Sequence, residues 1–476
     1  MRSTTPFLSF LLALPFTAHA TTWQVGPGLT YTLPSQVSTL VSNGDTVDIA
    51  AGTYPSDVAA WTADDLLLRG VGGFAHLESN GMAWGDKAIW VIQGDRTTVE
   101  WIEFSECSVP DQNGAGIRQE GKGLVVRQCY FHDNENGILA GEVHPSTIRI
   151  EHSEFDHNGF GDGFSHNLYI GNIDSLIFRF NYSHHAHVGH ELKSRAWVNV
   201  IEYNRFSNEA NGDASREIDL PNGGQAYLIG NVIQQGPLGE NSNLVAYGIE
   251  GLTNPVAHEF YAINNTLVNE KSVGSFFAVM NGADLFKAYN NILSGGGTFT
   301  PGWWPATVDT LANVVTSIAA VQFVSPAAYD YHLQATSPAD NSGYPAGIAN
   351  SGYPLVAWYE YLHPLGYVAR CQQATLDVGA FETCTTGVED APTHIGSSGA
   401  MHTALNPATA QVQVSFLTNA IPTTIEILDA KGRLLRTWPV NGQRSVVLDL
   451  NGLSVGLHLL RASGTGGVFT ERLIVY

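Results

Sequence analysis

Positive charge is scarce in this chain. Its 476 residues include 22 Lys and Arg against 44 Asp and Glu, which gives a formal net charge of −22, and only six of the cations are lysines. Nucleic-acid binding needs a basic surface that neutralises phosphates, so this balance argues against a nucleic-acid partner. An anionic polysaccharide would also be repelled by the protein as a whole. Such a substrate would need a local cationic site or a bound metal, and the position of each lysine is therefore informative.

Long apolar runs are also lacking beyond the N-terminal segment. No later stretch has the roughly 20 apolar residues that a membrane-spanning helix requires, so we expect no transmembrane anchor. The N-terminus has a basic start at Met1 and Arg2, a short apolar run at Phe7–Leu14 and small residues at Ala18–Ala20. This order is typical of a signal peptide. We therefore predict that residues 1–20 are removed and that the mature chain begins near Thr21, outside the cytoplasm.

Cysteine is rare, with four in the whole chain. Disulfides persist in the oxidising compartments that an exported chain reaches. Cys371 and Cys384 are close in sequence and flank a short segment, so we expect a local bridge between them. Cys107 and Cys129 are about one sequence repeat apart. The spacing leaves open whether they form a bridge or only stack as buried thiols, since it does not give the separation of their Cα atoms.

A repeated pattern runs from about residue 90 to residue 297. Each unit has a short alternating strand, a turn rich in Gly, Asn and Asp, and an apolar pair that follows an Asn. The marker asparagines of successive units are Asn181, Asn204, Asn231, Asn265 and Asn291, and Cys129–Phe131 and Ser153–Phe155 have the same phase. Their spacing falls within the range of roughly 20–50 residues that is typical of solenoid repeats. This period and composition predict a β-solenoid with one coil per repeat, because helical solenoids need apolar residues at 3.6 spacing.

The marker asparagines have a structural explanation. Asn tolerates the bend between two strands, and amides stacked from one coil to the next can hydrogen-bond to one another. We therefore interpret these five residues as an internal ladder and exclude them from the catalytic candidates.

Several segments resemble a known superfamily. Gly44–Ile49 with Gly52–Tyr54, and then Leu66–Gly70, look like the first coils of pectate-lyase-like β-helix proteins. Tyr329–Leu333, Ser337–Ala339 and Asp377–Glu382 look like the closing elements of the same superfamily. The resemblance covers about residues 22–384, and it implies a right-handed parallel β-helix. It says little about chemistry, since one fold hosts many functions.

The C-terminal residues form a different pattern. Residues 385–403 are polar and rich in Gly, Ser and Thr, which predicts a linker. From residue 404 short strands alternate with turns. Ile425–Asp429, Leu448–Leu450, Gly456–Arg461 and Leu473–Tyr476 resemble the type A sorting domain of the type IX secretion system, although His458 stands where that family more often has Tyr. The resemblance implies a small Ig-like β-sandwich that directs the protein to the cell surface or to release, by way of the periplasm.

The sequence thus predicts an all-β protein in four parts. These are a signal peptide at residues 1–20, a parallel β-helix at residues 21–384, a linker at residues 385–403 and a sorting domain at residues 404–476. We expect a monomer that engages the type IX secretion machinery during export. A sugar-binding sandwich is the alternative interpretation of the last part.

Polar and charged residues gather on four consecutive predicted strands. Strand residues alternate between core and solvent, so equal positions in successive coils form outward columns. Aligning the strands on Leu168, Leu192, Ile218 and Ile249 gives two such columns. One holds Asn167, Glu191, Glu217 and Gly248, and the other holds Tyr169, Lys193, Asp219 and Glu250. His166, His190, Arg195 and Arg216 lie at the borders of this patch.

Charged residues on an exposed sheet are usually only solvated, and that explanation fits any one of these residues. The cluster as a whole is harder to explain in this way, because it combines a rare lysine, two arginines, several carboxylates and two histidines. Titrating groups packed this closely are a common mark of a site.

Uronate β-elimination would suit this cluster. The reaction needs a neutralised carboxylate, a base for the C5 proton and an acid for the leaving oxygen. Glu191–Ser194 and Arg216 are similar to the calcium-dependent alginate lyase and chondroitinase B family. This resemblance implies Lys193 as base and Arg216 as acid. The carboxylates around Lys193 would hold it protonated unless Ca²⁺, bound by Asn167, Glu191 and Glu217, cancels their charge. His190 and Tyr169 are further catalytic candidates, and the substrate-binding candidates are Arg195, His166, Asp219 and Glu250. The acidic pair and lysine are closer in sequence here than in that family, and Arg216 precedes its strand.

Two other motifs have weaker functional interpretations. The histidines of His184–His190 could meet at one transition-metal ion, but their spacing follows no fixed helical pattern. Use of His190 as an acid or as a substrate hydrogen-bonding group is the preferred interpretation. Trp303 and Trp304 could stack on a sugar ring, and a hydrophobic plug in a loop is the structural alternative.

Three classes of function therefore remain. A polysaccharide lyase acting on an anionic, uronic-acid-containing glycan is preferred. A glycoside hydrolase would instead use two of Glu191, Glu217, Asp219 and Glu250, and a C5-epimerase would share the proton-abstraction step. A non-catalytic surface protein would bind glycan and convert nothing.

Overall fold

The structure of the chain is a computed structural model. It describes residues 20–302, 305, 307–371 and 375–383 of the first part, and residues 401–404, 411–416, 422–429, 433–440, 442, 443, 445–453, 456–464 and 467–475 of the last part. The chain divides into two compact units, residues 1–384 and residues 385–476. The predicted signal peptide lies almost wholly outside the described residues.

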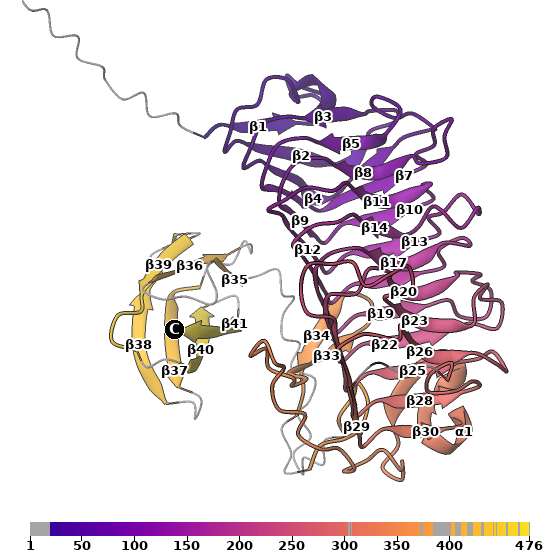
Figure 1. Cartoon of the computed structure of the whole chain (residues 1–476). Coiled ribbons are helices and arrows are strands. Elements are labelled where there is room, and N and C mark those ends of the chain that lie inside the picture. Colours follow the sequence, from indigo (N-terminus) through magenta and orange to yellow (C-terminus); the bar gives the residue numbers. More distant parts are fainter. Residues whose placement is uncertain are drawn as a thin grey trace, which may run out of the picture. The chain divides into compact units, whose positions relative to one another are not determined.

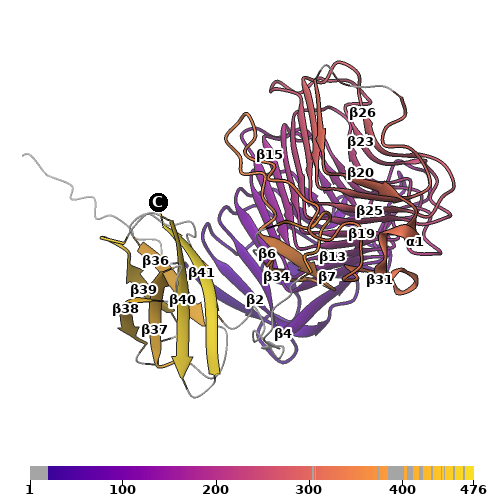
Figure 2. The same cartoon turned by 90° about the horizontal axis from the view of Figure 1, so that it is seen from below.

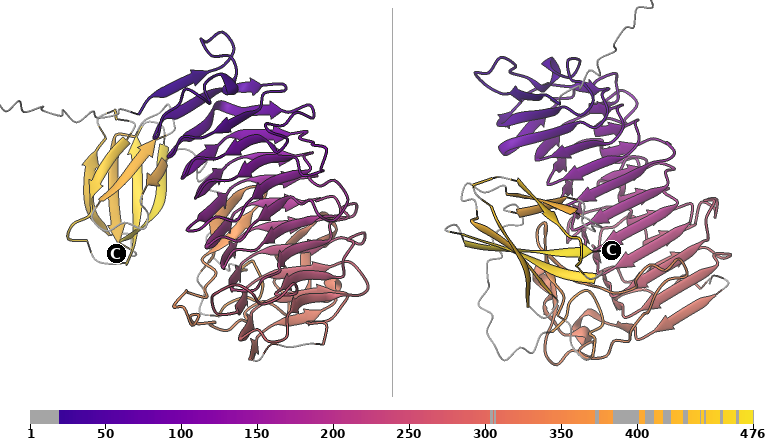
Figure 3. Two further views of the ribbon diagram at one scale, coloured as in Figure 1. Left: turned by 45° about the horizontal axis from the view of Figure 1, so that its top comes forward. Right: turned by 90° about the vertical axis from the view of Figure 1, so that its left-hand side faces the viewer.

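The first unit is a parallel β-solenoid of about ten turns, as the repeats predict. Figure 1 shows its coils stacked in chain order from β1 to β30, and Figure 3 shows the strands of successive coils side by side in two further views. Each strand pairs in parallel with the equivalent strand of the next coil, so the coils form three ladders of strands.

The first ladder consists of β1 (Thr22–Val25), β2 (Thr46–Thr53), β4 (Leu67–Glu78), β6 (Thr97–Glu100), β9 (Leu124–Arg127), β12 (Thr147–Glu151), β15 (Ser175–Arg179), β18 (Val198–Glu202), β21 (Gln225–Ile229), β24 (Glu259–Ile263), β27 (Leu285–Tyr289) and β29 (Val308–Leu311). The second ladder continues from the long strand β4 through β7 (Ile102–Ser105), β10 (Tyr130–His132), β13 (Glu154–Asp156), β16 (Tyr182–His184), β19 (Arg205–Ser207), β22 (Val232–Gln235), β25 (Thr266–Asn269), β28 (Ile292–Gly295) and β30 (Val314–Thr316). The third ladder consists of β3 (Ala59–Trp61), β5 (Ala88–Ile92), β8 (Ala115–Gln119), β11 (Asn136–Ala140), β14 (Leu168–Ile170), β17 (His190–Ser194), β20 (Arg216–Leu220), β23 (Asn243–Tyr247) and β26 (Ser275–Val279).

The core fills the inside of the coils. Alternate residues of each strand point inward, and equal positions stack from coil to coil. In the second ladder Phe104, Phe131 and Phe155 form such a stack, with ring centroids 4.9 Å apart at each step. All three rings are fully buried. The alternating strands of the sequence therefore bury one continuous column of aromatic and aliphatic side chains.

The asparagine ladder is confirmed. Asn204 donates from its backbone N and from Nδ2 to Asn231 Oδ1, at 3.0 Å each, and Asn231 bonds in the same way to Asn265. Asn181 and Asn291 continue this chain of bonds in both directions, and Asn313 extends it by one coil. Each amide satisfies a backbone group at a buried bend, which explains why the coils from Asn181 to Asn313 repeat the residue.

Cys107 and Cys129 are free, buried thiols. They do not stack on each other, because they lie at different corners of the coil. Cys129 continues the asparagine ladder through Ser153 Oγ, whereas the Cys107 backbone N donates to Asn134 Oδ1 at another corner. The sequence separation of the two cysteines is close to one repeat, but it does not place them at equivalent positions of successive coils. Cys371 is disulfide-bonded, and its predicted partner Cys384 lies outside the described residues.

The chain after β30 returns along the outside of the solenoid. Residues 346–359 pack on outward side chains of the first ladder such as Tyr227 and Tyr261. Val321, Phe323 and the segment around Phe381 cover Val268 and Ile292 of the second ladder, near α1 (Figure 2). The elements outside the ladders are η1 (Pro34–Gln36), α1 (Ile318–Val321), β31 (Phe323–Ser325), η2 (Pro326–Ala328), β32 (Asp330–Leu333), β33 (Tyr359–Leu362) and β34 (Gly366–Ala369).

The second unit has two antiparallel sheets. One sheet has the order β35–β36–β39 and the other β38–β37–β40–β41. Their shared core includes Val412, Ile427, Leu448 and Leu460. The first strand, β35, falls partly in the segment predicted as linker, because it pairs with β36 at the sheet edge. The strands are β35 (Met401–Ala404), β36 (Gln411–Phe416), β37 (Thr424–Asp429), β38 (Leu434–Pro439), β39 (Ser445–Asp449), β40 (Gly456–Gly464) and β41 (Gly467–Val475).

Candidate functional site

Three neighbouring strands of the third ladder, β14, β17 and β20, bring most of the predicted site residues together. Tyr169 is the register partner of Lys193, and Lys193 is the partner of Asp219. His190 pairs with Arg216 in the same way. The alignment on Leu168, Leu192 and Ile218 is confirmed for these three coils, and all three of these residues are fully buried.

The alignment of the fourth coil was wrong. Ile218 pairs with Val245, so Asp219 pairs with Ala246 and the strand ends at Tyr247. Asn243–Tyr247 is largely buried, so it shows little of the alternation by which a strand is recognised. Gly248, with a φ of 73°, turns the chain after the strand. Glu250 therefore reaches the site from a turn that folds back over it.

Asn167, Glu191 and Glu217 are not part of the outward face, and all three are fully buried. Each is buried together with the inward residue that follows it, so the strict alternation between core and solvent fails here. Glu191 accepts hydrogen bonds from Asn167 Nδ2, Ser183 Oγ and the Ala186 backbone N. Burial raises the pKa of Glu191 to about 7, against the lowering effect of these hydrogen bonds.

These three residues do not fit a calcium site well. Calcium prefers oxygen ligands that face one ion. Asn167 instead turns its amide nitrogen to Glu191, and its Oδ1 accepts a hydrogen bond from Asn158 Nδ2 at 2.9 Å. Burial also raises the pKa of Glu217 well above its usual range. The calcium ion stays a prediction.

Lys193, Arg195 and Glu250 form a network at the outer edge of the site. Lys193 Nζ donates to Glu250 Oε1 at 2.8 Å, and Arg195 Nη2 donates to Glu250 Oε2 at 2.7 Å. Arg195 Nε also donates to the Tyr169 hydroxyl at 2.8 Å. Partial burial opposes ionisation of Glu250, but the hydrogen bonds from Lys193 and Arg195 lower its pKa on balance. Glu250 is therefore a carboxylate held between two cations, with a side chain 43% exposed.

Asp219 lies at the centre of the site and is 1% exposed. Its carboxylate oxygens lie 3.4 Å from His190 Nε2, 3.4 Å from Lys193 Nζ and 3.9 Å from Arg216 Nη1. Among the described residues none gives either oxygen a direct hydrogen bond. Burial raises the pKa of Asp219, although Lys193 and Arg216 oppose this effect. A buried carboxyl without hydrogen bonds is costly, and such a group is a common feature of functional sites.

Two stacked histidines form the other side of the site. The rings of His166 and His190 are nearly parallel, with centroids 4.8 Å apart. The His190 backbone N donates to His166 Nδ1 at 3.1 Å, so the neutral His166 ring carries its proton on Nε2. Burial and the charge of Lys193 lower the pKa of His166 to about 3. Burial and His166 lower the pKa of His190 well below its usual range, so both rings are neutral at physiological pH.

The charged cluster lies on β14, β17 and β20 and on the turn after β23. The column that contains Tyr169, Lys193 and Asp219 is apolar on both sides of them, with Leu139 before and Ala246 after. Lys193 itself is shielded, with a side chain 12% exposed. Ordinary solvation would spread charges over an exposed sheet. This concentration of shielded charge favours a binding or catalytic site.

Sequence reasoning missed two features. Asn222 Oδ1 accepts a hydrogen bond from Arg195 Nη1 at 2.6 Å, and its place in the turn after β20 is the signal that could have indicated it. A second group of histidines and carboxylates lies on the outer face of the second ladder, where the strands β10, β13 and β16 place polar residues on both sides of an inward residue.

The histidine run His184–His190 is split between two parts of the fold, since His187 pairs with Asp213 whereas His190 belongs to the third ladder. Trp303 and Trp304 lie outside the described residues.

The comparisons with known proteins concern mainly the second unit, whose two antiparallel sheets are described above. Residues 406–476 match the secretion system C-terminal sorting domain. This sorting domain indicates secretion or attachment at the cell surface through the type IX secretion machinery. The comparison with curated proteins gives no match for the chain, so the roles of the site residues rest on their own geometry. Within the described residues, no helix is long and apolar enough to cross a membrane. A β-helix that carries a secretion signal fits a carbohydrate-active protein.

Proposed function

We propose that the β-helix is a polysaccharide lyase that cleaves a uronic-acid-containing glycan by β-elimination. The observation that carries this proposal is the group of three cations, Lys193, Arg195 and Arg216, around two neutral imidazoles and a tyrosine hydroxyl. The chain as a whole is strongly acidic, so a cationic cluster on one face is the local site that an anionic glycan requires.

Lys193 and Arg195 are suited to bind the uronate carboxylate. β-Elimination begins with the removal of the C5 proton, which becomes acidic only when that carboxylate is neutralised. Both side chains now bind Glu250, a partly exposed residue on a turn, and a substrate carboxylate would replace Glu250 as their partner. Lys193 Nζ already lies 2.8 Å from Glu250 Oε1 and 3.4 Å from Asp219 Oδ2, so the site uses it to pair with carboxylates. We therefore assign it to carboxylate binding and not to proton abstraction.

His190 is the base and Tyr169 is the acid in this proposal. A neutral imidazole can accept the C5 proton, and Asp219, 3.4 Å from its Nε2, would stabilise the imidazolium that forms. The Tyr169 hydroxyl accepts its hydrogen bond from Arg195, so its own proton remains available for the leaving glycosidic oxygen. Arg216 and His166 hold Asp219 and His190 in place.

The decisive experiment is a substrate screen. The secreted chain would be incubated with uronic-acid glycans and with neutral glycans, with and without a calcium chelator. A lyase produces an unsaturated uronate, which is detected by its ultraviolet absorbance, only from the acidic glycans. A C5-epimerase would instead incorporate solvent deuterium at C5 without cleavage. A protein that only binds glycan would give neither product.

A glycoside hydrolase is the second candidate. Asp219 and Glu250 both contact Lys193 Nζ, at 3.4 Å and 2.8 Å, so the two carboxyls lie close together. The pKa of Asp219 is raised and that of Glu250 is lowered, which is the division expected between an acid and a base or nucleophile. A hydrolase would release reducing ends without the ultraviolet absorbance.

A further inference from the structure

Two dipeptides occupy the same position in successive coils of the second ladder. Asp156 is the last residue of β13 and His184 the last of β16, a histidine follows each, and Asp156 is the register partner of His184. The second residue of each pair has left-handed backbone, with φ of 50° at His157 and 53° at His185. Their rings stack with centroids 4.9 Å apart and nearly parallel planes. The repeat of the solenoid thus brings together four metal-binding side chains from two successive coils.

Three donor atoms of this group converge. His184 Nδ1 lies 2.8 Å from His185 Nδ1 and 3.0 Å from Asp156 Oδ1. Possible ligand atoms of Asp156, His184 and His185 all lie within 4.8 Å of one another. The imidazole of His157 also hydrogen-bonds through Nδ1 to Asp156 Oδ1.

The far side of each imidazole is occupied by an oxygen atom. His184 Nε2 lies 3.2 Å from Glu154 Oε1, and His185 Nε2 lies 3.3 Å from Asn211 Oδ1. Each oxygen favours the tautomer with hydrogen on Nε2, which leaves the Nδ1 lone pairs of the two rings facing each other. Such a contact needs either a proton or a metal ion between the two nitrogens. A carboxylate or amide oxygen on the remote nitrogen is also the usual arrangement around histidines that bind metals.

The separations are close to those of a tetrahedral ion. With metal–ligand bonds of about 2.0–2.1 Å, neighbouring ligand atoms of a zinc tetrahedron lie about 3.3 Å apart. The separations of 2.8 Å between His184 Nδ1 and His185 Nδ1 and of 3.0 Å between His184 Nδ1 and Asp156 Oδ1 would have to open by about 0.3–0.5 Å.

We propose that Asp156, His184 and His185 form a binding site for a divalent transition metal, with Zn²⁺ as the ion that its nitrogen and oxygen donors suit best. His157 is a positioning residue that holds the Asp156 carboxylate. Three protein ligands leave the fourth position of a tetrahedral ion open to water or to an oxygen of a ligand. The site is on the second ladder and shares no residue with the proposed lyase site on the third.

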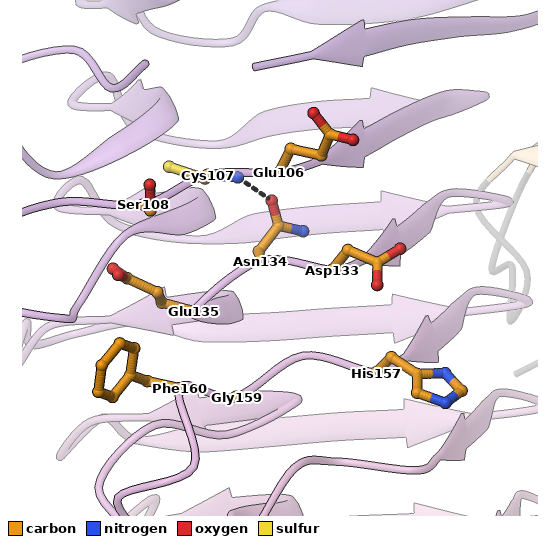
Figure 4. A pocket seen from close by; sticks show the side chains of 9 residues that line it. All are labelled: Glu106, Cys107, Ser108, Asp133, Asn134, Glu135, His157, Gly159 and Phe160. Carbon is orange, nitrogen blue, oxygen red and sulfur yellow. Dashed lines mark hydrogen bonds between the residues drawn. The ribbon is translucent and has the colours of Figure 1, made fainter. Parts of the chain in front are cut away.

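A hollow of about 420 Å³ adjoins this cluster at His157. Figure 4 shows His157 together with Asp133 and Glu106, which follow the ends of the two preceding strands of the ladder. The hollow is open and partly polar in its lining, so solvent and ions can approach the cluster from this side.

Metal binding is tested on the full chain after dialysis against a chelator. Titration with Co²⁺ should give the visible absorption bands of a tetrahedral ion at one equivalent, and added Zn²⁺ should abolish them. Zn²⁺ should also raise the thermal midpoint, because an ion that binds only the folded state stabilises it. His185→Asn keeps a residue that tolerates left-handed backbone, so it should fold normally. This variant and Asp156→Asn should weaken binding by more than about 100-fold, the upper range for changes in the outer shell.

His187→Asn is the matched control, because it removes an exposed histidine of the same run that is paired with Asp213. It should bind Co²⁺ as the unchanged chain does, whereas Glu154→Gln should weaken binding by about 10-fold. The proposal fails if the chain gives no tetrahedral Co²⁺ spectrum, or if His185→Asn binds normally. It also fails if binding is lost only in His132→Gln, since the ion would then lie at His76, Glu103 and His132. None of these results depends on lyase activity.

Discussion

Lys193 and Asp219 are register partners on neighbouring coils, and Lys193 Nζ lies 3.4 Å from Asp219 Oδ2. The lysine is one of six in the chain, and the carboxyl is almost completely buried. A parallel solenoid places equal positions of successive coils side by side, so a lysine and an aspartate one coil apart in sequence become neighbours. Their contact joins the cations of the proposed site to the base His190.

Replacing Lys193 by Met should abolish most of the turnover of a uronic-acid glycan. We expect kcat/KM to fall by about 100-fold or more, because the substrate carboxylate loses a cation that makes its C5 proton acidic. The side chain points outward, so the fold should be retained, as circular dichroism would check. Lys287→Met is the matched control, since Lys287 is another outward lysine paired with an aspartate, Asp309. Normal activity in Lys193→Met combined with its loss in Glu250→Gln would favour the hydrolase.

The pH dependence of kcat/KM should identify His190 as the base. Protonation of the base at low pH removes activity, and the pKa of His190 lies well below its usual range. The acid limb of the profile should therefore lie below about pH 6.5, the ordinary value for histidine. His190→Gln should be inactive at every pH, and Tyr169→Phe should lose less activity on substrates with a good leaving group. An acid limb at the ordinary histidine pKa would contradict this assignment.

Glu191 should make the protein less stable as pH rises. Its folded-state pKa is about 7, against 4.5 for the free side chain. A group whose pKa is raised on folding contributes stability below pH 4.5, and this contribution is lost as pH rises to about 7. Between pH 4.5 and about 7, the thermal midpoint of Glu191→Gln should change less with pH than that of the unchanged chain. Loss of the Glu191 hydrogen-bond acceptor would shift the whole curve by a constant amount and would not change its slope. Exposed Glu106→Gln serves as the control and should leave the slope unchanged. A stabilisation by Ca²⁺ that disappears in Glu191→Gln would instead support the calcium site.

Asn231 should be essential for stability and not for chemistry. Its Oδ1 accepts two hydrogen bonds from Asn204, and its Nδ2 donates to Ile201 O and Asn265 Oδ1. Asn231→Ala leaves several buried groups unpaired at about 1–3 kcal/mol each, so we expect a loss of ~3 kcal/mol or more in thermal or urea unfolding. Exposed Asn43 accepts one hydrogen bond from the Asp64 backbone N, and Asn43→Ala should cost less than ~1 kcal/mol. Equal losses in the two variants would argue against a stabilising ladder.

Removing residues 404–476 should stop export across the outer membrane. The truncated chain should accumulate in the periplasm, because the sorting domain is the part that the secretion machinery recognises. Cell fractionation gives the location, and a protease-resistant β-helix in the periplasmic fraction shows that the loss is not caused by misfolding. Undiminished secretion of the truncated chain would refute this role.

Part of the site could be predicted from sequence because it depends on local periodicity. The alternation around Leu168, Leu192 and Ile218 was visible, and it placed Tyr169, Lys193 and Asp219 in one column. The role of Glu191 could not be predicted, since Glu191 and the next residue, Leu192, are both buried. Alternation predicts that only one of two successive strand residues is buried.

The sequence by itself determined the solenoid, its asparagine ladder and the strands of the sorting domain. Each of these follows from a repeat or an alternation that a short segment displays. Only the tertiary structure decided that Glu250 folds back onto Lys193 and Arg195, and that Asp156 meets His184 and His185. These contacts depend on turn geometry and on the length of each coil, which set how residues far apart in the chain come together in space.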